Sequence, residues 1–194
     1  AVIGVNATTI TVETHTDQGV NFYLVGLPDS AVKESQHRIV AALKNNGLKW
    51  PGYRITINLA PADIRKEGSA YDLSIALGIL AASGQKEFQE LSNYLIIGEL
   101  SLDGGLVPVK GVLPSVLQAK KEGFRSVLLP LENAQEAGMV EGINVFGAEN
   151  IVQAVRHLTG EEMLNKTALK LVDQFKKERK TPRFDFSEVR GQLT

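Results

Sequence analysis

The sequence predicts a domain of the α+β class, an α/β sandwich in which one mixed sheet carries packed helices. Two observations predict it. Segments rich in β-branched residues are interleaved with segments whose apolar residues recur at helical spacing. The chain of 194 residues is 43% hydrophobic and 22% charged, a globular balance with enough length to bury a core.

The position of each element follows from local spacing. Asp29 or Ser30 caps the first helix, Gly47 stops it, and the turn residues Asp17–Gly19 predict a hairpin of the first two strands. The predicted strands are residues 8–15, 20–27, 53–60, 94–109 as a bent pair, 126–130 and 143–147. The predicted helices lie within residues 28–47, 72–83, 112–123, 132–139 and 149–160.

Composition excludes several classes of function. The chain has no cysteine, so disulfides, thiolate metal sites and thiol catalysis are excluded. His15, His37 and His157 are scattered through unlike contexts, and no metal site is expected. No stretch approaches the roughly 18 apolar residues of a membrane span, and no secretory signal opens the sequence. We therefore expect a cytoplasmic protein with no membrane partner.

Ser69 stands just before a long apolar helix pattern, so it is either a nucleophile or a residue that starts the helix. A serine hydroxyl becomes a nucleophile only when a base takes its proton. The spacing from Ser69 to Asp72 fits a capping box, in which the hydroxyl accepts a backbone N–H, and Asp72 is itself an alternative cap. The residues alone favour a capping or turn role.

Four motifs resemble those of one bacterial family. They are VGLPDSAVKES, ITINLAPADIRKEGSAYDLSIALGILAASG, IIGELSLDGGLVPVKGVL and FDFSEVRGQ. In this order they are similar to the ComM/YifB family, the magnesium-chelatase-like AAA+ ATPases, over essentially the whole chain. The resemblance implies an N-terminal domain at residues 1–160, with the Lon-protease-like fold also called ribosomal-protein-S-five-domain-two-like. It implies a polar helix and basic linker at 161–183 and the start of an AAA+ ATPase module at 184–194.

Lon-type peptidases carry the motif K-D-G-P-S-A-G, with the nucleophile at its serine. When KEGSAYD is matched to that motif, Ser69 falls on the proline and Ala70 on the nucleophile. The general-base lysine of those peptidases matches Leu113 here. The resemblance therefore implies a peptidase scaffold without its catalytic residues. The alternative is a Ser-Lys peptidase that uses Ser69 with Lys110 or Lys66, displaced from the matched positions.

ATP hydrolysis by a P-loop needs the pattern G-x-x-x-x-G-K-[ST], and the chain contains no Gly-Lys pair. No cofactor is therefore expected in this chain. The resemblance implies that a full-length protein binds ATP and Mg²⁺ and forms a hexameric ring. It also implies action on DNA, as a helicase or branch-migration factor in natural transformation and recombination. A third hypothesis, a chelatase accessory subunit, finds no Cys or His cluster in support.

Two acidic and basic groupings are further candidates for a site. Glu99 and Asp103 lie four residues apart, so on a strand they share one face. Their alternative role is to end a buried strand and to make the turn after it. Asp63, Arg65 and Lys66 precede a helix whose N-terminus attracts anions, which makes a binding role conceivable.

The composition changes near Gly160. Residues 166–194 carry eight basic and four acidic residues and few large apolar ones. The run KKERKTPR is either a solvated linker or a contact for nucleic-acid phosphates, and composition favours the linker. The candidate DNA contacts are Lys176, Lys177, Arg179, Lys180 and Arg183.

Overall fold

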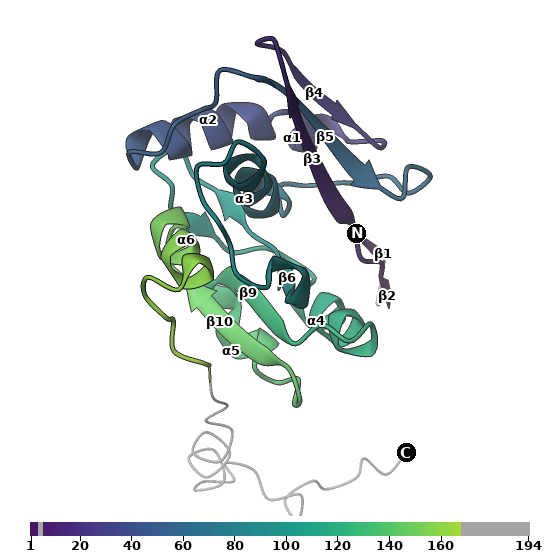
Figure 1. Ribbon diagram of the computed structural model, residues 1–194. Helices are drawn as coiled ribbons and strands as arrows, with labels where there is room; N and C mark the ends of the chain where they lie inside the picture. Colours follow the sequence, from purple (N-terminus) through teal and green to yellow (C-terminus); the bar gives the residue numbers. More distant parts are fainter. Residues whose placement is uncertain (4–5, 168–194) are drawn as a thin grey trace, which may run out of the picture.

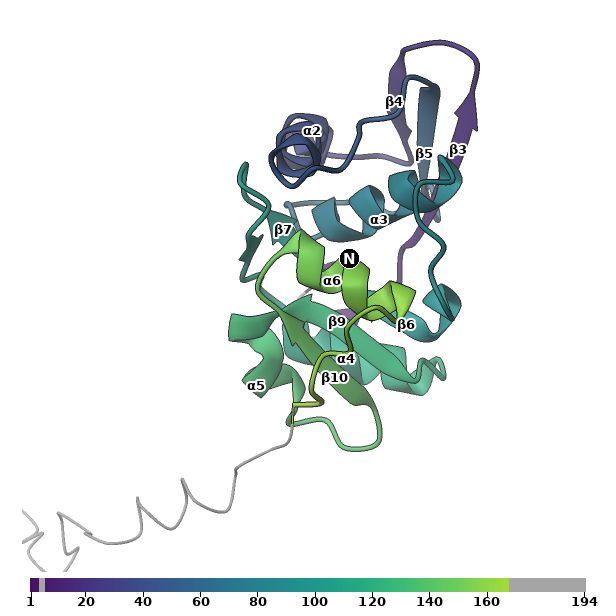
Figure 2. The same ribbon diagram turned by 60° about the vertical axis from the view of Figure 1, so that its left-hand side comes forward.

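The computed structural model describes residues 1–3 and 6–167. These residues form an α+β domain, as predicted, but their strands divide into two three-stranded sheets and two short ribbons. Helix α3 (Asp72–Ala82) lies between the two larger sheets (Figures 1 and 2). The prediction of a single mixed sheet is thus wrong, because three strands of the later part of the chain, at 94–96, 126–130 and 144–148, pair only among themselves.

The first sheet has the strand order β3–β5–β4. Its centre is β5 (Arg54–Ala60), which runs antiparallel to β3 (Thr11–Asp17) and parallel to β4 (Phe22–Val25). The predicted hairpin of the first two strands is therefore wrong, since β5 lies between them. Of the three strands, β5 is the most deeply buried, in keeping with its central place. Its fully buried residues are Ile55, Ile57 and Leu59.

The second sheet is parallel, with β9 (Ser126–Pro130) between β10 (Asn144–Ala148) and β6 (Tyr94–Ile96). Every residue of β9 is buried, as its short continuous apolar run predicts. The predicted bent strand pair at 94–109 is split. Its first strand, β6, joins this sheet, whereas β7 (Glu99–Leu100) and β8 (Leu106–Val107) form a separate antiparallel ribbon.

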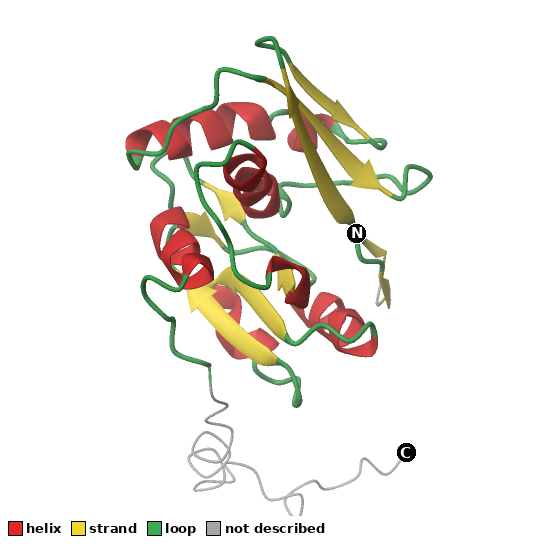
Figure 3. Cartoon of the chain, viewed as in Figure 1, coloured by secondary structure: helices red, strands yellow, loops and turns green. Residues whose placement is uncertain are grey.

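The helices cover these sheets as shown in Figure 3. Asp29 caps the first helix, as predicted, because its Oδ1 accepts the Val32 N–H at 2.8 Å. The predicted helix at 28–47 is broken at Glu34 into two. Besides α3, the helices are α1 (Ser30–Lys33), α2 (Ser35–Asn45), α4 (Val112–Lys121), α5 (Ala134–Ala137) and α6 (Ile151–Thr159), with 3-10 turns at Leu91–Asn93 and Leu131–Asn133.

The chain begins with a small ribbon of β1 (Val2–Ile3) and β2 (Asn6–Ala7) beside α4. After α6, residues 161–167 contain no helix, and Lys166 pairs with Phe146 of β10. Most of the predicted linker at 161–183 and all of the predicted module at 184–194 lie outside the described residues, so the domain boundaries remain predictions. Within the described ranges, each helix is too short or too polar to cross a membrane.

Candidate functional site

The sequence motifs meet where two loops run side by side near the start of α3. The Lys66 N–H donates to the Leu27 carbonyl at 3.1 Å, and the Asp29 N–H donates to the Lys66 carbonyl at 2.9 Å. The second carboxylate oxygen of Asp29 accepts the Gly68 N–H at 3.1 Å. One aspartate therefore caps α1 and fixes the loop that carries Ser69.

Gly26 shows why this junction needs a particular residue. Its φ of +99° lies in a region that L residues rarely adopt, and a Cβ there would be 2.2 Å from the Leu59 carbonyl oxygen. Only glycine lets the loop approach the end of β5 so closely. The glycine of the G-L-P-D motif is therefore explained by backbone geometry.

Ser69 is held by a carboxylate. Its hydroxyl donates to Oε2 of Glu99 on β7, and its carbonyl accepts the Asp72 N–H at 3.2 Å. The N-cap of α3 is Tyr71, and no side chain caps it. The capping-box prediction is therefore wrong for both Ser69 and Asp72, because stronger charged partners take their side chains. The turn role of Ser69 is retained.

Asp72 forms a buried ion pair with Arg38 of α2. The Arg38 Nε lies 2.6 Å from Oδ2 and its Nη2 lies 3.0 Å from Oδ1, while the Leu100 N–H donates to Oδ2 at 3.2 Å. The Asp72 side chain is only 1% exposed. Burial raises the pKa of Asp72, and the bonds from Arg38 and Leu100 oppose that rise. The hydrogen bond to Asp72 raises the pKa of Arg38, so this arginine is a fixed cation.

Lys66 is fully buried, which sequence reasoning did not anticipate. Its Nζ donates to the Pro61 carbonyl within the same loop. Burial lowers the pKa of Lys66, and nearby Asp63 opposes this shift. Arg65 turns instead to Glu67, 3.2 Å away on the surface. The predicted anion-binding group is therefore not assembled, because its lysine points inward and its arginine is paired outside.

The two halves of the alternative dyad are not brought together. Lys110 is exposed just before α4. Among the hydrogen bonds of the described residues, Ser69 has no lysine partner; its hydroxyl is bound by Glu99. Lys66 likewise bonds Pro61 rather than Ser69. At the positions matched to a Lon dyad stand Ala70 and Leu113, neither of which carries a proton to transfer.

Glu99 and Asp103 bind different groups. Asp103 sits in the turn between β7 and β8, where its Oδ1 accepts the Ser101 hydroxyl at 2.5 Å and the Gly105 N–H at 3.1 Å. The hydrogen bond from Ser101 lowers the pKa of Asp103. Glu99 holds Ser69, so the pair does not act as a joint acid and base.

The three histidines lie on different elements. His15 and His37 are exposed on β3 and α2, whereas His157 is buried in α6. In the part of the chain that the structure describes, no group of three or more His, Cys, Asp or Glu side chains is placed to hold a metal ion. The five basic residues proposed to contact DNA lie outside the described residues.

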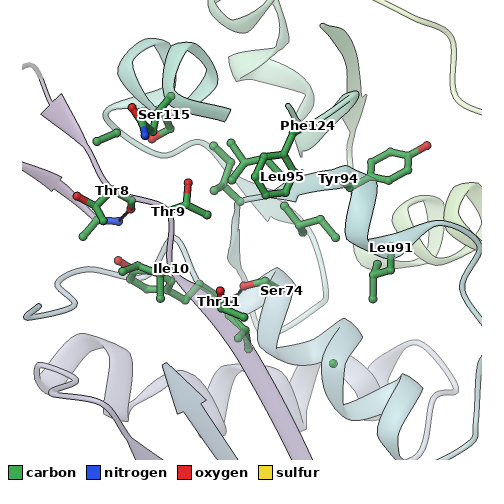
Figure 4. A pocket seen from close by; sticks show the side chains of 18 of the residues that line it. Thr8, Thr9, Ile10, Thr11, Ser74, Leu91, Tyr94, Leu95, Ser115 and Phe124 are labelled. Carbon is green, nitrogen blue, oxygen red and sulfur yellow. Dashed lines mark hydrogen bonds between the residues drawn. The ribbon is translucent and has the colours of Figure 1, made fainter. Parts of the chain in front are cut away.

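A cleft of about 430 Å³ opens between the start of β3, α3, β6 and α4. Figure 4 shows hydroxyl groups of Thr9 and Ser74 on its walls together with the apolar side chains of Leu95 and Phe124. Among the described residues that line it there is no acidic, basic or histidine side chain. Sequence analysis missed this cleft, since its walls come from segments that are far apart in the chain and carry ordinary residues.

Two small sheets around α3, with a loop that aligns with the start of the Lon motif at residues 66–68, define a Lon-like α+β domain. The relatives agree with this class. Lon protease 2 of Bacillus subtilis is 28% identical over 127 residues, which cover 65% of this chain and 22% of that protein.

The chain belongs to the family described as "Subunit ChlI of Mg-chelatase", which matches residues 12–133. It is 44% identical over 165 residues to "Competence protein ComM" of Haemophilus influenzae, covering 84% of this chain and 32% of that protein. It is 41% identical over 167 residues to "Uncharacterized protein YifB" of Escherichia coli, covering 86% of this chain and 33% of that protein. The chain thus spans about a third of the length of these curated relatives.

Proposed function

We propose that this chain is the non-catalytic Lon-like N-terminal domain of a ComM/YifB-type AAA+ ATPase, and that it serves binding or assembly. The observation that carries the proposal is the bond from the Ser69 hydroxyl to Glu99, together with Ala70 and Leu113 at the matched catalytic positions. The scaffold is retained while the atoms that a Ser-Lys mechanism needs are replaced.

The electrostatics support this proposal. A lysine that activates a serine must be neutral near pH 7 and must contact the hydroxyl. Lys110 is exposed, and among the hydrogen bonds of the described residues it makes none to Ser69. Lys66 is buried, but its Nζ is directed at the Pro61 carbonyl. Neither lysine supplies both conditions.

For the whole protein we propose an ATP- and Mg²⁺-dependent motor that forms a hexameric ring in the cytoplasm and acts on DNA as a helicase or branch-migration factor. Support comes from the family match and from the relative named as a competence protein. The share of this domain would be contact with DNA or a partner, or assembly of the ring. The P-loop would lie outside this chain, which has no Gly-Lys pair.

A serine-reactive fluorophosphonate tests the non-catalytic proposal. We expect no stoichiometric labelling of the 194-residue chain, in the wild type or in Ser69→Ala. Ser101→Ala is a matched control, since the Ser101 hydroxyl also bonds a carboxylate. Labelling that is lost in Ser69→Ala and kept in Ser101→Ala would establish an active serine and overturn the proposal.

The motor is tested on the full-length protein. We expect ATP hydrolysis that requires Mg²⁺ and rises when branched DNA is added, with Ser69→Ala leaving the rate unchanged. A full-length protein that binds neither ATP nor DNA would refute the motor. Tight binding of a tetrapyrrole in the same preparation would favour the chelatase alternative instead.

A further inference from the structure

Two sheet edges meet at the cleft. Among the described strands, β3 pairs only with β5 and β6 pairs only with β9, so each is the edge of its sheet. The cleft is lined by residues 94–97, which include all of β6, and by residues 7–12, of which Thr11 and Val12 begin β3. Successive side chains of a strand point to opposite faces, so a surface that meets consecutive residues faces the edge of the strand. The cleft therefore exposes backbone as well as side chains.

The backbone N–H and C=O groups of β6 alternate between the side that faces β9 and the free edge of the strand. Along an edge strand, every second residue turns its N–H and C=O away from its only neighbour. The Ile97 N–H donates to the Leu128 carbonyl of β9 at 3.1 Å, so residue 97 faces β9. By alternation, the backbone groups of Ile96 face away from β9. An edge of this kind accepts one more strand.

The side chains restrict what that strand can be. Among the described residues no acidic, basic or histidine side chain lines the cleft, and burying an unpaired charge is costly. The α-amino group of Ala1 does line it, but it donates to the Thr8 carbonyl at 2.7 Å, and burial lowers the pKa of this amine to about 6, so that it is mostly neutral near pH 7. The walls offer apolar surface from Ile10, Leu95 and Phe124 and hydroxyl groups from Thr9 and Ser115 (Figure 4). These match an uncharged occupant that alternates small apolar and hydroxyl side chains.

We propose that the cleft binds an extended, uncharged segment of polypeptide, which adds to the edge of β6 as a strand. Main-chain hydrogen bonds to the edge would supply affinity, and the apolar walls would select the side chains. The proposal deepens the function given above and rests on it in one respect, namely that the bound segment is held and not cut.

The probe is the fluorescent hexapeptide Thr-Val-Ser-Val-Thr-Val, acetylated and amidated so that its ends carry no charge. Fluorescence polarisation with the 194-residue chain should give saturable binding. Two further peptides carry N-methyl groups on the odd or on the even residues, which removes the donors along one edge only. We expect one of these two peptides to bind at least about tenfold more weakly and the other to keep its affinity.

Ser115→Trp and Leu117→Trp are the matched protein variants. Both lie on α4, but Ser115 lines the cleft, whereas Leu117 is absent from its lining and is 44% exposed. Ser115→Trp should weaken binding at least about tenfold, and Leu117→Trp should leave it unchanged. The N-methyl comparison uses only the wild-type chain, so it stands even where Ser115→Trp lowers stability.

The outcomes separate the two proposals. No saturable binding, no difference between the N-methylated peptides, or an equal loss in both variants would overturn the strand-addition proposal and leave the non-catalytic function untouched. Cleavage of the bound hexapeptide, detected by mass spectrometry, would overturn the non-catalytic function while leaving the peptide site in place.

Discussion

The two three-stranded sheets are stabilised by different means. Around the first sheet the buried polar residues include two ionisable groups of opposite sign, Lys66 and Asp72. Around the second, among the described residues, the buried polar side chains are Ser126, Asn133 and His157, and none is an acid, a lysine or an arginine. The parallel sheet is thus held chiefly by apolar burial. The mixed sheet depends in addition on charges taken out of water.

This difference teaches how to interpret the motifs. The G-L-P-D and K-E-G-S-A-Y-D segments both belong to the first half, where Asp29 caps two backbone segments and Asp72 pairs with Arg38. A buried charge is costly unless its partners are present, so replacing one member of such a pair is expected to destabilise the fold. The structural roles of these residues therefore explain the motifs without a catalytic role.

The largest expected effect comes from breaking the buried pair. Asp72→Ala leaves Arg38 without its carboxylate and the Leu100 N–H without its acceptor. We expect the free energy of unfolding to fall by about 3–5 kcal/mol, as for other buried pairs that lose one partner. Urea unfolding followed by circular dichroism measures it.

The control is an exposed ion pair near α6. Glu162→Ala removes an exposed pair with Arg156, in which the two charges are 3.1 Å apart and the side chains are 51% and 66% exposed. Solvent screens this pair, so the loss should stay within about 1 kcal/mol. A similar fall in the free energy of unfolding for Asp72→Ala and Glu162→Ala would show that the regions around the two sheets are not stabilised differently. The double substitution Arg38→Met with Asp72→Leu should recover much of the lost stability.

A smaller effect on stability is expected at His157, a buried ionisable residue that packs beside the second sheet. Its Nδ1 accepts the Leu164 N–H at 3.1 Å, so in the neutral ring the proton is on Nε2, 3.2 Å from the Tyr94 hydroxyl. The Phe146 ring packs on it at 4.4 Å between centroids. Burial lowers the pKa of His157 below its ordinary value of 6.5.

The sign of the pH dependence follows. Because the unfolded chain takes up the proton at a higher pH than the folded chain, the stability from this group is present above about pH 6.5 and is lost as the pH falls toward the folded pKa. Urea unfolding between pH 7.5 and pH 5 should show the decline in the wild type and a flatter profile in His157→Phe. Identical profiles would assign the acid sensitivity to other groups.

Much of the fold could be predicted from local pattern. The α+β class, the burial of α3 and the Asp29 cap follow from spacing alone. Strand partners could not be predicted, because β5 follows β4 by about thirty residues in the chain and local spacing does not show which strand takes the centre of a sheet. The ring, ATP, Mg²⁺, DNA and the cytoplasmic location stay predictions.

The candidate site was harder to predict than the fold. The spacing from Ser69 to Asp72 fits a capping box, but the Ser69 hydroxyl bonds Glu99, thirty residues away in the chain. A hydrogen bond to a carboxylate is stronger than one to a neutral backbone group, and local spacing does not reveal such a distant partner. Lys66 stands in a loop with charged neighbours, a pattern typical of a surface, yet it is buried. The cleft depends on two sheet edges that only the tertiary structure brings together.

The smallest expected effect tests whether a buried, unpaired hydroxyl destabilises the first sheet. The Thr14 hydroxyl oxygen is buried on β3 and has no hydrogen-bond partner among the described residues. Two residues on, the Thr16 hydroxyl donates to the Ala82 carbonyl at 3.1 Å. Thr14→Val should therefore raise the free energy of unfolding by about 1 kcal/mol, and Thr16→Val should lower it by about as much. Two substitutions of one kind on one strand thus predict opposite signs in urea unfolding, and a loss at both would mean that the Thr14 hydroxyl is satisfied after all.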